Sequence, residues 1–360
     1  MPGKPVVFES SDHFRQRLLL ATLSTRPVKF EKIRADSDEP GLKDYEVSFL
    51  RLLDKICNGS RIDINYSGST VTYRPGLIVG GKVSHTCPPT KAIGYFLEPI
   101  TILAPFAKKP LMLTLEGVTN NDTDPSVDAL RTVALPILRR FGVDAGLELK
   151  ISKRGAPPLG GGEVFFRCPV VRALTPIKLV DSGRIKRIRG IAYSTRVSPQ
   201  ISNRVVDAAR GVLNKLLPDV YIYTDNYRGA EAGKSPGFGL SLVAESTTSA
   251  LASAECIARP AELAEDLGVR AAKSLLAEIK RGGCIDTQHQ SMCLLLMTLC
   301  PEDLSRVRMG SGLTQYTIQY LRDIRTFMGT TFRIKPDEPT GTTIFSCIGS
   351  GYINVSKKAA

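Results

Sequence analysis

The stretch KRGAPPLGGGEVFF, from Lys153 to Phe166, places three consecutive glycines directly before a run that reads as a β-strand. A glycine triplet can expose backbone N–H groups to an anion, but it can equally form a turn that needs positive φ and close backbone approach. A nucleotide-binding P-loop would continue into Lys, Ser or Thr and a helix, whereas Glu163 and a strand follow here. As a generic phosphate loop the segment is therefore weak, and its surroundings must decide its role.

The composition is that of a globular chain with a marked positive charge. Lys and Arg number 48 against 35 Asp and Glu, which gives a formal net charge of +13 over 360 residues. A surplus of this size favours a polyanionic partner such as RNA. No uncharged run approaches the roughly twenty residues that span a bilayer. The N-terminal segment carries acids before its apolar stretch, unlike a secretory signal, so we expect an intracellular protein without a membrane segment.

The cysteines give no sign of a metal or disulfide framework. All eight are scattered along the chain without a single C-x-x-C pair. This spacing argues against a zinc site and against a set of disulfides. We therefore expect reduced, buried thiols and no metal site.

Hydrophobic periodicity predicts an α+β chain in which strands and helices alternate. Strands are expected near residues 28–33, 62–66, 70–73, 111–117, 163–167, 188–197, 221–224, 239–244, 249–256 and 305–309, with terminal strands that run to the tail VSKKAA. Helices are expected near residues 45–56, 90–104, 126–141, 199–216, 262–281, 290–299 and 314–327. The character of the chain shifts near Asp181. We predict a body of repeated units in two parts, 1–180 and 262–360, separated by a compact inserted α+β domain at 181–261.

The surroundings of the glycine triplet are more specific than the triplet itself. The segment resembles the signature R-G-x-x-P-x-G-G-G-x-V of the RNA 3'-terminal phosphate cyclase family, with every fixed position filled; the residues are Arg154, Gly155, Pro158, Gly160, Gly161, Gly162 and Val164. IRADSDEPGL (33–42), EGVTNNDTDPSVD (116–128) and KRIRGIAY (186–193) extend the resemblance over most of the chain. It implies repeated units of two helices and a four-stranded sheet, with a small inserted α+β domain.

The residues that such cyclases use for catalysis are replaced in this chain. A cyclase begins with a G-E-G-G-G-Q segment, and the corresponding region here is ESSDHFRQRLLL, in which Asp12 is an imperfect stand-in for the acid. His13, Phe14 and Arg15 are too bulky to let a backbone approach a phosphate as glycine does. The family nucleophile is a histidine that becomes adenylylated by ATP, and the resemblance places Tyr316 at that position. A phenol with a pKa near 10 is a poor nucleophile at neutral pH.

Two lesser departures point the same way. The acids Asp36, Asp38 and Glu39 stand where the family usually carries basic residues, and they would repel a triphosphate. The resemblance places Ser291 and Met292 at the positions of an acid–Gln pair on a late helix. We therefore predict that cyclase activity is absent and that no cofactor is bound.

What remains resembles the cyclase-like branch of the family, which lacks cyclase activity. That resemblance implies a nucleolar ribosome biogenesis factor of the small-subunit processome, needed for early pre-rRNA cleavages that yield small-subunit rRNA. The implied partners are a large ribosome-assembly GTPase and pre-rRNA, with no DNA and no membrane. In this interpretation the glycine triplet is a structural turn inherited from an enzyme, where an anion site could remain.

Several basic residues are candidates for contact with RNA. The densest run lies at the entrance to the inserted domain and could pair with phosphates, although solvated charge beside a strand is an equal alternative; it comprises Arg184, Lys186, Arg187 and Arg189. The weaker candidates of the same kind are Arg139 and Arg140, Lys108 and Lys109, and Lys357 and Lys358. The loop from Tyr227 to Gly239 is a candidate docking surface for a partner.

Two enzymatic alternatives stay open. Arg322, Asp323 and Arg325 lie within about one helical turn, and together they could cleave pre-rRNA through a general base and charge stabilisation. A salt-linked helix face is the simpler interpretation of the same pattern. The other alternative is an active ATP-dependent RNA 3'-phosphate cyclase with a rewired nucleophile.

Overall fold

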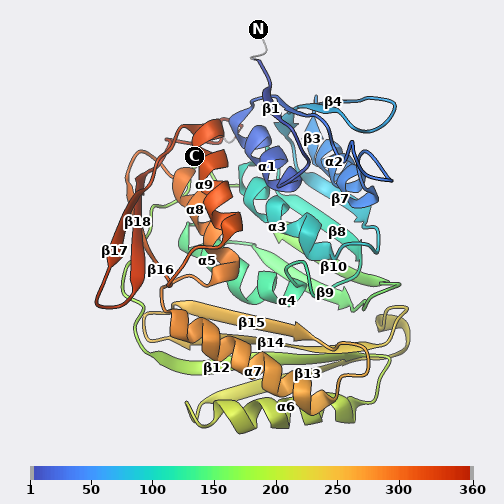
Figure 1. Ribbon diagram of the computed structural model, residues 1–360, viewed down its shortest axis with the longest axis vertical. Coiled ribbons are helices and arrows are strands. Elements are labelled where there is room, and N and C mark those ends of the chain that lie inside the picture. Colours follow the sequence, from blue (N-terminus) through green and yellow to red (C-terminus); the bar gives the residue numbers. More distant parts are fainter. Residues whose placement is uncertain (1–3, 357–360) are drawn as a thin grey trace.

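A computed structural model describes residues 4–356 and shows three sheet-and-helix units packed around shared helices, with an inserted unit at one end (Figure 1). In the first unit the strands are Val6–Phe8 (β1), Val28–Phe30 (β2), Arg61–Ile64 (β4) and Val71–Arg74 (β5). Its helices are Phe14–Ser24 (α1) and Asp44–Ile56 (α2), and a short strand pair joins Cys57–Asn58 (β3) to Leu77–Ile78 (β6).

The second unit carries the glycine loop between its last two strands. The strands are Gly81–Thr86 (β7), Leu111–Gly117 (β8), Glu148–Lys153 (β9) and Gly162–Cys168 (β10). The first helix is Ile93–Leu103 (α3), extended by a 3₁₀ turn at Ala104–Phe106; the second consists of Val127–Ala129 (α4), a π-helical turn at Leu130–Ala134 and Leu135–Arg140 (α5). The π turn precedes Pro136, which lacks the N–H that a regular α-helix needs there.

The third unit is split by the insertion. Its strands are Lys178–Leu179 (β11), Leu304–Met309 (β16), Arg333–Asp337 (β17) and Thr342–Ile348 (β18). Its helices are Gln290–Thr298 (α8), preceded by a 3₁₀ turn at Thr287–His289, and Gln315–Met328 (α9). The inserted chain leaves after β11 and returns before α8, so one unit encloses the whole insertion.

All three units share one topology. Their sheets run β1-β2-β5-β4, β7-β8-β10-β9 and β11-β16-β18-β17. In each sheet the first pair is parallel and the other two pairs are antiparallel. A parallel pair needs a crossover, which a helix supplies, whereas the final antiparallel pair needs only a short connection. The predicted α+β fold of repeated two-helix, four-stranded units is therefore confirmed.

The inserted unit has its own sheet and its own core. Its elements are Ile185–Thr195 (β12), Pro199–Leu213 (α6), Val220–Tyr227 (β13), a 3₁₀ turn at Gly229–Glu231, Gly237–Ser246 (β14), Leu251–Ile257 (β15) and Ala264–Arg281 (α7). The strand order is β13-β12-β14-β15. Leu267, Ala271 and Leu275 of α7 are buried in the same apolar cluster as α6 and the sheet. We propose that this unit extends to Arg281, past the domain boundary predicted at residue 261.

The main core joins the three units into one body. α1 packs against α3 and α9, and these helices lie between the sheets in Figure 1, while the inserted unit lies at the lower end. One continuous buried apolar cluster runs through all three units. All eight cysteines are free and buried, as predicted. Among residues 4–356, every helix is too short or too polar to traverse a bilayer.

Near the ends of the units, hydrophobic periodicity was not sufficient to predict the strands correctly. β1 and β7 were not predicted, because a three-residue strand and the polar run GKVSHT carry little periodicity. The prediction that strands continue to the C-terminal tail is wrong for residues 349–356, since the last strand ends at Ile348. Gly349 turns the chain there against the backbone of Cys300, where a side-chain Cβ would come within 2.2 Å of the carbonyl oxygen.

Candidate functional site

The glycine loop packs tightly against backbone on both sides. Gly160 and Gly161 adopt left-handed φ values of 62° and 81°. A Cβ on Gly160 would lie 2.9 Å from the carbonyl carbon of Gly117 at the end of β8. On the other side the loop meets the inserted unit, where the Lys234 N–H donates to the Gly160 carbonyl at 2.8 Å. The geometry is that of a turn that needs glycine for close approach.

Arg154, the first residue of the signature, ties the body to the inserted unit. Its buried guanidinium donates to both oxygens of Asp128 at 2.7 and 2.8 Å and to Asp225 of β13 at 3.0 Å. It also lies over the ring of Tyr193, 4.4 Å from the centroid. Burial would raise the pKa of the Asp128 carboxyl, but the ion pair with Arg154 outweighs it and holds that pKa below its usual value. The signature residue is therefore a structural anchor.

Tyr316 stands in a hollow formed by the first turn of α9 and the segment before α1. Its ring centroid lies 5.6 Å from that of His13 and 6.0 Å from that of Tyr320. His13 adopts a left-handed φ of 57°, a conformation that glycine adopts readily. Burial raises the pKa of Tyr316 to about 12, so the phenol is neutral at physiological pH. Burial also lowers the pKa of His13, with Arg17 adding to the effect.

The hollow beside Tyr316 has a volume of about 520 Å³, and the three cations that line it are already paired. Their ion pairs are Arg15–Glu98 at 2.5 Å, Arg34–Glu46 at 2.8 Å and Lys91–Asp124 at 3.2 Å. Paired cations attract an incoming anion much less than free ones, because their charge is already compensated at short range. Asp36, Asp38 and Glu39, which the sequence suggested would repel a triphosphate, are exposed and do not line this hollow.

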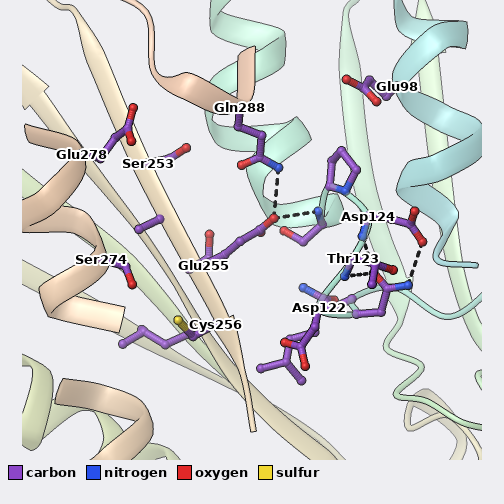
Figure 2. Close-up of a pocket in the computed structure, with 18 of the residues that line it drawn as sticks. Glu98, Asp122, Thr123, Asp124, Ser253, Glu255, Cys256, Ser274, Glu278 and Gln288 are labelled. Atoms are coloured by element: carbon purple, nitrogen blue, oxygen red, sulfur yellow. Dashed lines mark hydrogen bonds between the residues drawn. The ribbon is translucent and has the colours of Figure 1, made fainter. Parts of the chain in front are cut away.

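A second hollow of about 540 Å³ adjoins the first and lies between the body and the inserted unit. Among the residues that the structure describes, Arg15 is the only basic one that lines it, and five carboxylates face it, those of Glu98, Asp122, Asp124, Glu255 and Glu278. Figure 2 shows Glu98 on the α3 side and Glu255 entering from β15. Its field therefore disfavours an anionic ligand.

Glu255 is the most constrained of these acids. One carboxylate oxygen accepts from the Ser126 N–H and from the Gln288 amide, both at 3.1 Å, as Figure 2 shows. The other oxygen is buried without a hydrogen-bond partner in the described structure. Burial raises the pKa of the Glu255 carboxyl, and the two hydrogen bonds only partly offset this effect.

ATP, the co-substrate implied by the resemblance, does not fit these residues. Bulky side chains fill the segment that is glycine-rich in cyclases. The cations that line the hollow beside Tyr316 are already paired with carboxylates, and the neutral phenol of Tyr316 stands at the nucleophile position. Ser291 and Met292 are buried in α8 near Tyr320. Within residues 4–356, no cluster of three or more His, Cys, Asp or Glu side chains has a geometry suited to a metal ion.

The predicted RNA-binding run is largely neutralised. Lys186 and Arg187 share Glu245, at 2.8 and 2.6 Å, and Arg189 pairs with Asp219 at 2.7 Å. Arg184 alone among the four has its side chain exposed outside any ion pair in the described structure. Among the weaker candidates, Arg139 pairs with Asp144 at 3.2 Å and Arg140 donates to the Ser249 carbonyl, whereas Lys108 and Lys109 are exposed. Lys357 and Lys358 lie outside the described residues.

The proposed nuclease residues do not form one cluster. Asp323 is 2% exposed and accepts from Gln16 at 3.1 Å, from Arg17 at 3.2 Å and from Gln319 at 2.9 Å. Arg322 and Arg325 are exposed on the other side of α9. The carboxylate therefore joins α1 to α9 and has no free face for a substrate.

The predicted docking loop is also partly covered. Ala232, Gly233 and Ser235 are buried, and the Gly233 N–H donates to the Arg154 carbonyl at 2.6 Å. The chain carries a more exposed set of cations that the sequence analysis did not single out: Lys178, Arg306, Arg333 and Lys335. Alternation in LSRVRM (304–309) is the signal that could have found part of this set, because Ser305, Val307 and Met309 are the buried positions.

Comparison with known proteins agrees with the sequence signature. The profile of the family described as RNA 3'-terminal phosphate cyclase matches residues 6–334. The human RNA 3'-terminal phosphate cyclase-like protein is 54% identical over 363 residues, 97% of each chain. The rRNA processing protein rcl1 of Schizosaccharomyces pombe is 50% identical over 354 residues, 98% of this chain and 97% of its own. The corresponding protein of Saccharomyces cerevisiae, also named as an rRNA processing protein, is 42% identical over 365 residues, 99% of this chain and 98% of its own. This chain belongs to the RNA 3'-terminal phosphate cyclase family.

Proposed function

We propose that this protein acts in rRNA processing as a ribosome biogenesis factor and lacks cyclase activity. In this proposal it is a nucleolar component of the small-subunit processome, is required for early pre-rRNA cleavages that yield small-subunit rRNA, and binds a large ribosome-assembly GTPase. Near-full-length similarity to proteins named for rRNA processing supports the general role. The processome, the GTPase and the nucleolus are expectations from the family resemblance.

One observation carries the non-cyclase part of the proposal. At the family's nucleophile position stands Tyr316, a phenol whose pKa burial raises to about 12. A nucleophile that attacks ATP must supply an electron pair at neutral pH, which an imidazole does and such a phenol does not. The paired state of Arg15, Arg34 and Lys91 supports the same conclusion, because among residues 4–356 no unpaired Lys or Arg lines the hollow.

Covalent labelling tests this part directly. Purified protein is incubated with Mg²⁺ and ATP labelled in the α-phosphate, beside an active cyclase of the family as the positive control. We expect no protein-bound AMP in the wild type or in Tyr316→His, because the substitution restores an imidazole but neither the glycines nor free cations. AMP attached to the wild-type chain would overturn the proposal.

Depletion and complementation test the role in rRNA processing. Cells that lack the protein should accumulate pre-rRNA uncleaved at the early sites, and both wild type and Tyr316→Phe should restore cleavage, since the phenol takes part in no chemistry. Recovery of a GTPase from nucleolar extract, in parallel with and without ribonuclease, tests the partner. Normal pre-rRNA after complete depletion would contradict the proposed role.

The endonuclease alternative needs variants that leave the fold intact. Asp323 is an unsuitable first target, because its loss would disturb the contact between α1 and α9. Arg322→Ala with Arg325→Ala removes the exposed cations without touching the core. We expect normal pre-rRNA cleavage in this double variant and no cutting of a short pre-rRNA transcript by the purified protein.

A further inference from the structure

The outer face of the third sheet concentrates cations across neighbouring strands. In the register, Lys178 of β11 stands beside Arg306 of β16, and Arg306 stands opposite Ser346, which in turn stands opposite Arg333 of β17. The next row places Arg308, Ile344 and Lys335 side by side. Opposed residues in adjacent strands project from the same face of a sheet. The face therefore carries five basic side chains from three strands.

Four of these cations are free. Arg308 is held by Asp337 and also donates to Thr342 at 2.8 Å, so it joins β16 to β17. Within residues 4–356, the other four form neither an ion pair nor a side-chain hydrogen bond; they are Lys178, Arg306, Arg333 and Lys335. The described residues of these two rows include no acid, and Asp337, which stands opposite Thr342 in the following row, is already paired with Arg308.

The other sheets of the same topology do not share this feature. In the second sheet, Arg167 stands opposite Glu148, and Lys153 pairs with Glu163 at 3.9 Å. In the first sheet, Asp63 pairs with both Arg61 and Arg74, at 3.2 and 3.3 Å. The same scaffold thus carries mixed charge in two units and unpaired positive charge in the third.

The face is also hollowed. A groove of about 730 Å³ lies over the sheet and includes Arg306, Arg333 and Lys335. Between the cations of β16 and those of β17 runs the column of β18, where Ile344 and the 65%-exposed Ile348 supply an apolar floor. Strands lie about 4.8 Å apart, so the two cationic sides are about 10 Å apart. In Figure 1, β17 and β18 form the outer left edge of the molecule.

We propose that this groove binds a single-stranded RNA segment, with phosphates on the free cations and bases against the apolar floor. The cations match a phosphate backbone, which positions RNA without reading its sequence. The floor is aliphatic, and Phe332 is the single aromatic side chain among the described lining residues, so base stacking contributes less than charge to the affinity. The choice of RNA as the polyanion rests on the proposed function in rRNA processing. The site is distinct from the hollow at Tyr316 and from the basic run at the entrance to the inserted unit, where Lys186, Arg187 and Arg189 are paired.

The test measures binding of a labelled uridine 12-mer by fluorescence anisotropy over a range of salt concentrations. The groove variant is Arg333→Ser with Lys335→Ser, and the matched control is Lys150→Ser with Arg167→Ser on the exposed face of the second sheet. Both variants lose two positive charges from a sheet of the same topology. Each phosphate contact to a single strand contributes about 0.7 to the slope of log affinity against log salt concentration. The groove variant removes two such contacts, so the magnitude of this slope should fall by about 1.4. Its affinity should fall roughly tenfold or more near 0.1 M salt.

Three outcomes would overturn the proposal that this groove binds RNA. Equal loss in both variants would mean that only the net charge matters, and no loss in either would mean that RNA binds elsewhere. Selective loss of binding to a polyglutamate peptide, with RNA affinity unchanged, would assign the groove to an acidic protein. Each of these outcomes leaves the proposed role in rRNA processing standing, since depletion of the whole chain tests that role separately.

Discussion

The hollow at Tyr316 and the outer face of the third sheet both carry several basic side chains, yet they differ in what those charges can do. In the hollow, Arg15, Arg34 and Lys91 each have a carboxylate partner within 3.2 Å. On the third sheet, Arg306 and Arg333 have none in the described structure. The net charge of +13 is therefore not equally available to an anionic ligand in all parts of the molecule. Whether a cation already has a carboxylate partner decides more about its availability than where it lies.

The physical reason for the difference is solvation. A charge withdrawn from water must be paired or hydrogen bonded, because its desolvation costs several kcal/mol. A charge on an exposed sheet face is solvated and needs no partner. The paired charges of the hollow at Tyr316 are therefore compensated within the fold, whereas unpaired charges on the sheet remain available for a ligand.

The largest expected effect is at Arg154, the most deeply buried of the paired cations. Arg154→Met removes both short guanidinium contacts of the fully buried Asp128 and leaves it only the longer guanidinium contact, to Arg131 at 3.4 Å, so we expect a loss of about 3–5 kcal/mol in the free energy of unfolding. Urea denaturation measures the loss. The neighbouring Lys153→Met, at a partly exposed position, should change stability by no more than about 0.5 kcal/mol. Similar losses of stability in the two variants would contradict the distinction between buried paired cations and exposed ones.

Asp323→Ala should have the second largest effect. It removes the partner of Arg17 and three hydrogen bonds, and we expect a loss of about 2–3 kcal/mol. The loss is smaller than at Arg154 because Arg17 is slightly exposed and keeps its contact with the ring of Phe8. Thermal and urea unfolding measure it, with Arg322→Ala as the exposed control. An unchanged stability in Asp323→Ala would show that this carboxylate is free for another role.

Glu255→Gln should stabilise the protein at neutral pH, by about 1 kcal/mol, because it replaces a desolvated carboxylate with a neutral amide. The folded-state pKa is raised above the ordinary value of 4.5. The wild-type carboxyl therefore favours folding fully only below pH 4.5 and loses that contribution as the pH rises through the raised pKa.

The difference between Glu255→Gln and wild type should accordingly shrink as the pH falls toward 4.5. Urea midpoints at several pH values measure it, and the exposed Glu116→Gln is the control. A gain that grows on acidification would contradict the assigned cause.

The smallest expected effect completes the comparison. Arg333→Ser with Lys335→Ser should leave the free energy of unfolding within about 0.5 kcal/mol of wild type, because both side chains are exposed and unpaired in the described structure. Differential scanning calorimetry checks this expectation. A loss of several kcal/mol would mean that these cations support the sheet, and the third sheet would then resemble the hollow.

Much of the fold could be predicted from local patterns. Helix α2 has its apolar residues at helical spacing, and Ser198 with Pro199 marks the start of α6, where the Ser198 hydroxyl accepts from the Gln200 N–H. The shared strand order could not be predicted, because units with the same topology differ too much in sequence. The packing of α7 on the inserted sheet likewise depends on contacts between distant segments.

The candidate sites divide in the same way. The sequence by itself determined that this chain carries the cyclase signature at Arg154 to Gly162 and that Tyr316 stands where the family places its nucleophile, because residue identity and spacing are local properties. Only the tertiary structure decided which charges are free. Glu245 and Asp219 neutralise most of the basic run on β12 and Asp323 is buried between two helices, while β11, β16 and β17 hold unpaired cations in water. Pairing and burial depend on residues far apart in the chain, and no local pattern records them.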